Sequence, residues 1–333
     1  MTAGDHLASF NFYGLKLGLR SSDALTIEYL RRDFRYFEKT NGEGDFNIHI
    51  LEKPPDYQSL PAMPASNYTI DYVTFRSKET VFTDYHGKGL RIYNTRERTY
   101  HIYSSDPDLR HEIAYLTVLS SVGRYLDLQH IHRVHALAVV KNGIAILVLL
   151  PEKGGKTTLA LRLLRTGKFK LLSEDSPLLT RSGEILPFPL RMGILPGEEP
   201  GIPSHYIYRS KFLRIGTKVL IDLDYFADKI AQPSRPGFVF LGERVLGNKA
   251  AILPAGIFTA AKKFIANSVV GMGLHQGMEY LLGSNIFETI SRSGLACSRL
   301  NNSLKVLRLT KVYRYQIGHD FENNIQVLLD FLH

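Results

Sequence analysis

The most constraining feature of this sequence is an unbroken apolar stretch, residues 144–150, that leads directly into a turn containing glycine. A run this apolar is best satisfied as a strand buried on both faces, which requires a sheet covered by helices. The segment behind the turn, residues 159–165, has the apolar spacing of a helix, and Gly167 ends it. A buried strand, a turn and a helix in this order predict an α/β fold.

The turn itself carries a chemistry that suits anions. The first backbone N–H groups of a helix are unpaired and the helix dipole adds partial positive charge. Glycines let the backbone approach phosphates, a lysine reaches the terminal phosphates, and a threonine hydroxyl holds the magnesium ion that bridges them. We therefore predict that the turn binds ATP and Mg²⁺. The residues predicted to contact the nucleotide are Lys153, Gly154, Gly155, Lys156, Thr157 and Thr158.

The phosphate-loop pattern is incomplete at its start. Leu150 stands where the full pattern has its first glycine, and Glu152 adds a negative charge near the expected phosphates. The alternative is an ordinary strand-to-helix turn, with Lys156 solvated and Thr157 in the first helical turn. The placement of the motif between a buried strand and a helix favours the phosphate site.

Three more polar groups flank the loop. His135 lies on the apolar strand ahead of it, and Glu174 and Asp175 follow a short strand behind the loop helix. By default such a histidine is a hydrogen-bonded core residue, and an acid pair is a solvated turn. Adjacent strand residues point to opposite faces, so the two acids converge only if a loop geometry brings them together.

Residues 135–189 resemble the catalytic core of the HPr serine kinase/phosphorylase family and its smaller relatives. The resemblance is carried by His135 ahead of the loop, by Glu174-Asp175 behind its helix, and by Pro187-Phe188-Pro189. The sequence departs from the family pattern at Leu150 and at Glu174, which replaces an aspartate. The resemblance implies a PEP carboxykinase-like P-loop core with a mixed sheet flanked by helices.

The same resemblance implies an ATP-dependent serine kinase, which transfers the γ-phosphoryl group to a serine hydroxyl of a peptide, protein or small-molecule acceptor. It implies His135, Glu174 and Asp175 as catalytic residues, and Thr157 with Asp175 or Glu174 as metal ligands. The other acid, helped by His135, would orient or deprotonate the serine hydroxyl. Two alternatives remain open. One is a catalytically degenerate relative that binds a nucleotide or a peptide, which Leu150 and Glu152 favour. The other is a P-loop NTP hydrolase. The sequence argues against it, because no separate apolar strand ends in the single aspartate that is typical of such hydrolases.

The rest of the chain divides around this core. Residues 1–129 predict a strand-rich α+β lobe with two helices, the first capped near Asp23, and a series of short strands between residues 68 and 103. Residues 130–333 are assigned to the kinase core. Strands are expected at 218–222 and 237–241, helices at 255–267, 274–282, 285–293 and 321–332, and an edge strand at 305–314.

Several isolated residues invite functional assignments that the sequence does not support. His130 and His132 lack the thiol partners of a zinc site and are expected in a loop. The single cysteine, Cys297, is expected to be a small core residue. A solvated surface is also favoured for five basic residues that could supply charge to a phosphoryl group: Lys211, Arg214, Lys218, Arg235 and Arg244.

Composition limits the partners and the compartment. The chain has 333 residues and a formal charge of +9, but no helix-turn-helix, zinc or aromatic RNA-binding signature. The charge therefore favours a polyanionic nucleotide or an acidic peptide over a nucleic acid. One cysteine, no apolar run of membrane length and no secretory signal predict a cytoplasmic protein without a membrane partner. A homo-oligomer remains open.

Overall fold

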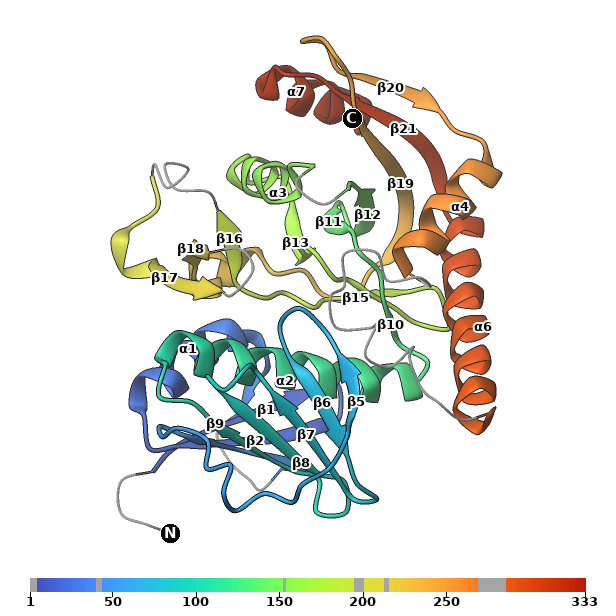
Figure 1. Ribbon diagram of the computed structural model, residues 1–333. Helices are drawn as coiled ribbons and strands as arrows, with labels where there is room; N and C mark the ends of the chain where they lie inside the picture. The colour runs from blue at the N-terminus through green and yellow to red at the C-terminus, as the bar shows by residue number, and fades with distance from the viewer. Residues whose placement is uncertain (1–4, 40–43, 152–153, 195–200, 213–215, 269–285) are drawn as a thin grey trace. The chain divides into compact units, whose positions relative to one another are not determined.

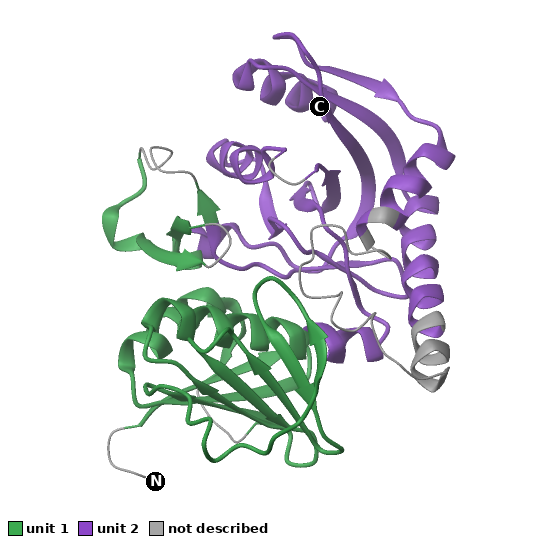
Figure 2. Ribbon diagram, in the orientation of Figure 1, with its two compact units in different colours: residues 1–122, 193–225 green, residues 123–192, 226–333 purple. Residues whose placement is uncertain are grey.

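The computed structural model describes residues 5–39, 44–151, 154–194, 201–212, 216–268 and 286–333 (Figure 1). The chain forms two compact units (Figure 2). Unit 1 comprises Met1–Val122 and Gly193–Tyr225, and unit 2 comprises Gly123–Met192 and Phe226–His333. The division expected from the sequence at residue 129 assigns residues 193–225 to the core, whereas their packing groups them with the N-terminal residues.

Unit 1 is built on a nine-stranded sheet of order β3-β1-β2-β4-β9-β8-β7-β6-β5. The strands β5 to β9 form an antiparallel meander, as the spacing of the short strands predicts, whereas β2, β4 and β9 are parallel. The strands are β1 (His6–Phe12), β2 (Leu15–Ser21), β3 (Glu38–Lys39), β4 (Phe46–Leu51), β5 (Ala65–Tyr68), β6 (Val73–Arg76), β7 (Thr80–Asp84), β8 (Leu90–Asn94) and β9 (Thr99–Tyr103).

Two helices pack against this sheet, α1 (Ala24–Asp33) and α2 (Pro107–Leu128). The predicted cap of α1 is confirmed, because the Asp23 carboxylate accepts the backbone N–H of Leu25 at 3.0 Å. Phe34, directly after α1, packs edge-on against Phe12 and stacks with Tyr115 of α2. This aromatic contact joins both helices to the sheet.

The inserted residues 193–225 carry a small sheet of order β16-β18-β17, with β16 (Met192–Ile194), β17 (Ile207–Phe212) and β18 (Gly216–Ile221). Three short helices lie in this unit or at its border, η1 (Arg35–Phe37), η2 (Ser204–Tyr206) and η3 (Leu223–Lys229). The Tyr208 hydroxyl donates to Asp33 at 2.7 Å, and Arg32 pairs with Asp222 at 2.8 Å. Such polar bonds, one buried and one partly buried, explain why the insertion belongs to unit 1.

Unit 2 contains a mixed six-stranded sheet of order β13-β11-β12-β19-β21-β20 and a small sheet of order β10-β14-β15. In the large sheet β12, β19 and β21 are parallel and the other pairs are antiparallel. The strands are β10 (His132–Arg133), β11 (Leu137–Lys141), β12 (Ile144–Leu149), β13 (Lys170–Ser173), β14 (Leu178–Leu179), β15 (Ile185–Leu186), β19 (Arg235–Arg244), β20 (Ala251–Pro254) and β21 (Lys311–Ile317).

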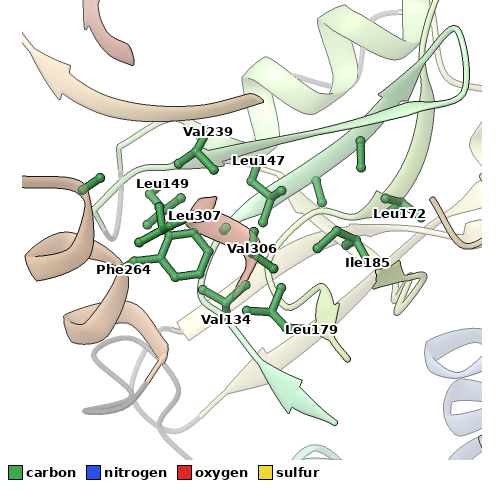
Figure 3. Packing of buried hydrophobic residues seen from close by; sticks show 14 of the residues in the cluster. Val134, Leu147, Leu149, Leu172, Leu179, Ile185, Val239, Phe264, Val306 and Leu307 are labelled. Atoms are coloured by element: carbon green, nitrogen blue, oxygen red, sulfur yellow. The ribbon is translucent and has the colours of Figure 1, made fainter. Parts of the chain in front are cut away.

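Helices cover both faces of the large sheet. They are α3 (Lys156–Arg165), α4 (Ile257–Ser268), α6 (Ile286–Arg308) and α7 (Phe321–Phe331). Side chains of β19 alternate between the faces. Val239 joins a cluster with Phe264 of α4 and Val306 of α6 (Figure 3), whereas Phe240 meets Phe331 of α7 edge-on. The chain is therefore α/β, with mixed sheets flanked by helices, as the apolar run of residues 144–150 predicts.

Several local predictions are confirmed and others are wrong. The strand expected at 237–241 and the helices expected at 255–267 and 321–332 are present as β19, α4 and α7, and residues 285–293 fall largely in the longer helix α6. The helix expected at 274–282 lies outside the described residues. The edge strand at 305–314 is wrong: Lys305 and Arg308 belong to α6, and β21 lies between β19 and β20.

Two further corrections concern single residues. Cys297 is exposed on α6 and is not a core residue. His130 occupies a turn with φ of 57°, but its neighbour His132 begins β10 and is fully buried. Within the described ranges, no helix combines the length and the apolar character needed to cross a membrane.

Candidate phosphate-binding site

The candidate site lies where several strand ends of the large sheet meet. β11 runs antiparallel to both β12 and β13, so His135 before β11 and the residues after β12 and β13 share one edge. β12 and β19 are parallel, so Arg244 at the end of β19 lies at the same edge. Ligands of open α/β sheets bind at the carboxyl ends of the strands, which makes this edge the expected position of a site.

Both glycines of the loop are required by its geometry. Gly155 is the N-cap of α3 with φ of 91°, in the left-handed region that disfavours a Cβ. Gly154 donates its N–H to the carbonyl of Pro151 at 3.0 Å, and a Cβ at Gly154 would lie 2.8 Å from that oxygen. The loop backbone is therefore held in a tight turn directly ahead of α3.

The missing first glycine has a structural counterpart in another strand. Leu150 is buried, and its side chain packs against Gly242 of β19. A Cβ at Gly242 would lie 2.3 Å from Cδ2 of Leu150, a distance that real Cβ atoms do not adopt. The side chain that departs from the loop pattern is thus accommodated within the sheet, in space left by a glycine of the neighbouring strand.

Lys156 is buried, so the alternative in which it is a solvated residue is wrong. Its Nζ lies 2.8 Å from Nε2 of His135 and donates to the carbonyl oxygens of Leu150 at 3.1 Å and Pro151 at 3.3 Å. An ammonium has three donors and no acceptor, so Nε2 of His135 accepts in this contact. The ring proton of a neutral His135 then resides on Nδ1.

That Nδ1 faces one of the two predicted acids. It lies 3.0 Å from Oδ1 of Asp175, although the N–H is not aligned as in a good hydrogen bond. The same carboxylate oxygen is 4.0 Å from Nζ of Lys156, and the backbone carbonyl of Asp175 accepts the N–H of Ala136 at 3.2 Å. The structure thus gathers a lysine, a histidine and an aspartate from three elements.

The other acid has a different partner. The hydroxyl of Thr157 donates to Oε1 of Glu174 at 2.5 Å. Mg²⁺ prefers oxygen ligands and usually takes one or two carboxylates together with water and substrate phosphates. Thr157 and Glu174 fit a site of that kind, whereas the predicted ligand Asp175 lies against His135. Among described residues, no group of three or more His, Cys, Asp or Glu side chains could hold a metal.

Of the two remaining predicted nucleotide contacts, the structure describes Thr158. Thr158 lies in the first turn of α3 and is partly buried. Lys153 and Glu152 lie outside the described residues. The geometry of the loop itself therefore rests on the residues from Gly154 to Thr157.

Arg244 is exposed, as the sequence predicts, but it lies beside the loop. Its Nη2 lies 3.6 Å from the position that a Cβ of Gly155 would occupy, as does Cζ of Phe321. The guanidinium groups of Arg162 and Arg244 lie 5.5 and 5.7 Å from the ring centroid of Phe321. The sequence signals this position only by placing Arg244 just beyond the end of a predicted strand. That this strand lies beside β12, and so brings Arg244 to the loop, follows from the order of the sheet.

Of the other basic candidates, Arg235 lies on the same strand as Arg244. Arg235 begins β19 and so lies at the opposite end of that strand from Arg244, while Lys211 and Lys218 belong to unit 1. Arg214 lies outside the described residues. In comparisons with known proteins, no protein-family model matches the chain and no curated protein matches it.

Proposed function

We propose that this chain is an ATP-dependent serine kinase with a PEP carboxykinase-like P-loop core, akin to the HPr serine kinase/phosphorylase family. The observation that carries the proposal is the contact of Lys156 with His135 beside a glycine N-cap of α3. Helix N-termini bind phosphate, and a buried lysine at that position serves as a charge for the terminal phosphates. A nucleotide and a serine-containing acceptor are the proposed partners.

The nucleotide phosphates are assigned to the loop and its neighbours. Gly154 and Gly155 keep side chains away from the backbone amides, and Lys156 exchanges its contacts with the loop carbonyls for phosphate oxygens. Arg244 supplies a second positive charge because its guanidinium lies beside Gly155. Phosphoryl transfer depends mainly on such positioning and charge neutralisation, so these groups account for most of what the protein must supply.

The two acids are assigned different roles from their different partners. Thr157 and Glu174 share a short contact and would hold magnesium, which when bound neutralises phosphate charge. Asp175, beside His135, would orient the acceptor and receive the proton of its hydroxyl. The side chain of Asp175 is 44% exposed, so an acceptor from solvent can reach it.

The test is phosphoryl transfer from γ-labelled ATP with Mg²⁺ to serine-containing peptides and free serine. We expect label on the acceptor with the wild-type chain, and loss of label with Lys156→Ala and Asp175→Asn. Lys168→Ala is the matched control, because Lys168 is exposed beyond the end of α3. A melting-temperature shift with Mg-ATP measures binding separately from transfer.

The other outcomes of this experiment would indicate a rival function or refute the proposal. Free phosphate without labelled acceptor, again dependent on Lys156, would indicate an NTP hydrolase. A thermal shift without either product would indicate a degenerate nucleotide-binding protein. If Mg-ATP neither shifts the melting temperature nor loses its label, the kinase proposal is wrong.

A further inference from the structure

A second cluster of reactive groups in unit 2 shares no residue with the candidate phosphate-binding site. A chain of hydrogen bonds ends on the hydroxyl of Ser298, in the helix α6. Oδ1 of Asp127 lies 2.8 Å from Nδ1 of His132, and Nε2 of His132 lies 2.8 Å from Oγ of Ser298. Nδ1 of His130 lies 2.9 Å from the same hydroxyl oxygen.

The positions of the protons follow from the charge of Asp127. Burial raises the pKa of this carboxyl, but the hydrogen bond with His132 and the charge of Arg299 outweigh it, and the pKa lies below its ordinary value. Ionised Asp127 can only accept, so Nδ1 of His132 carries a proton and Nε2 of the neutral ring accepts one. The hydroxyl proton of Ser298 is therefore directed at His132, and His130 donates to the oxygen.

Aspartate, histidine and serine are thus joined through the same atoms as in serine nucleophiles activated by a histidine base. His132 is fully buried and held between two partners, which fixes the direction of its ring. Ser298 is partly exposed and His130 is exposed, so a small molecule can reach the hydroxyl.

Unit 1 contains a similar set of residues that lacks this access. Nδ1 of His111 lies 3.1 Å from Oγ of Ser210, and its Nε2 lies 2.7 Å from Asp33. All three side chains are at most 2% exposed, so their hydrogen bonds serve only to hold the inserted strands. Ser210 is therefore an internal control for Ser298.

We propose that Ser298 is a nucleophile toward small activated acyl esters, with His132 as its base and Asp127 as a positioning residue. Oγ of Ser298 bonds to the acyl carbon as its proton moves to Nε2 of His132. The carbon–oxygen bond to the alcohol then breaks, and the leaving oxygen takes that proton. Water, activated by the same nitrogen, releases the acid and restores the serine. His130 is the donor nearest to the developing negative charge on the acyl oxygen.

The experiment uses the full chain with p-nitrophenyl acetate and, separately, with an alkyl fluorophosphonate followed by peptide mass mapping. We expect steady release of nitrophenol and one covalent adduct at Ser298. Ser298→Ala should remove both, and His132→Gln should slow both by about 100-fold or more. Asp127→Asn should slow both by at least about tenfold, since the ring loses its fixed tautomer.

Two further variants serve as controls for the reaction at Ser298. Ser210→Ala should leave both rates unchanged, and Cys297→Ser should do the same, because the exposed thiol beside Ser298 could otherwise react with the ester. If wild-type Ser298 carries no adduct and nitrophenol release is unchanged by Ser298→Ala, the proposal is overturned. The hydrogen bonds would then serve only to tie α6 to the turn before β10. The adduct at Ser298 is measured on the wild-type chain, so a variant that fails to fold does not obscure that result.

Discussion

The ammonium of Lys156 lies 2.8 Å from the ring of His135, and both side chains are at most 6% exposed. Lys156 is the first residue of α3, and His135 lies in the segment that leads into β11. The loop lysine is therefore held by the segment that precedes a neighbouring strand. A sequence interval that family resemblance associates with catalysis thus corresponds to direct contact between two side chains.

Replacing His135 should separate nucleotide binding from phosphoryl transfer. In His135→Gln the amide retains a hydrogen-bonding group near Lys156 but does not reproduce the ring nitrogen that faces Asp175. We expect the thermal shift with Mg-ATP to persist and kcat for serine phosphorylation to fall by up to about 100-fold, because general-base catalysis by Asp175 contributes about that much and depends on the ring that orients the carboxylate. The control is His333→Gln at the exposed chain end. An unchanged kcat would remove His135 from the proposed mechanism.

Gly242 should be intolerant of even one added carbon. Its Cβ would lie 2.3 Å from Cδ2 of Leu150, so Gly242→Ala should lower the free energy of unfolding by about 1–3 kcal/mol. Denaturant unfolding measures this loss. Gly256→Ala is the matched control, because a Cβ there meets nothing within 4 Å.

A second substitution tests the cause. Leu150→Ala removes the atoms that would collide, so adding Gly242→Ala to it should cost clearly less than adding it to the wild type. Equal costs in both backgrounds would show that Leu150 is not the reason for the glycine.

Two histidines on the unit 1 sheet should make stability depend on pH. The rings of His49 and His101 lie 5.0 Å apart, in the paired strands β4 and β9. Burial lowers the pKa of both, and repulsion by His101 and Arg20 lowers the pKa of His49 further. The folded state therefore favours the neutral rings, and its stability is greatest above the unfolded pKa of about 6.5.

The free energy of unfolding should accordingly decrease as the pH falls from 7 to 5, because the unfolded chain binds these protons more readily. In His101→Gln this slope should become shallower. Urea unfolding at several pH values provides the measurement, with exposed His86→Gln as the comparison. If the free energy of unfolding of His101→Gln changes with pH as steeply as that of the wild type, His101 is not a source of the pH dependence.

Arg110 should be among the most sensitive residues of unit 1. Its side chain is 1% exposed and donates to Asp23 at 2.6 Å and to the carbonyl of Ser104 at 2.8 Å. Arg110→Met leaves both acceptors without this donor and should lower the free energy of unfolding by about 3–5 kcal/mol. The exposed Arg96→Met should change it by less than about 0.5 kcal/mol. Similar changes in the free energy of unfolding for both variants would show that the buried hydrogen bonds of Arg110 do not stabilise unit 1.

Local elements were predictable because their causes lie close together in the chain. The apolar run forms β12, the glycine turn precedes α3, and Asp23 caps α1. The histidine and the acid pair were also recognisable as candidates from their positions around the loop. The error at residues 305–314 has a physical reason. Alternating bases resemble an exposed edge strand, but α6 continues through Arg308, and β20 pairs with β21 on its outer side.

The sequence by itself determined the α/β class, the strand–glycine–helix unit and the identity of the polar groups around it, since each follows from neighbouring residues. Only the tertiary structure decided that Glu174 meets Thr157 while Asp175 meets His135, and that Arg244 lies beside Gly155. It also decided that Asp127, His132 and Ser298 form one hydrogen-bonded chain. Sheet order and helix packing create these contacts between residues distant in the chain, and no local pattern encodes them.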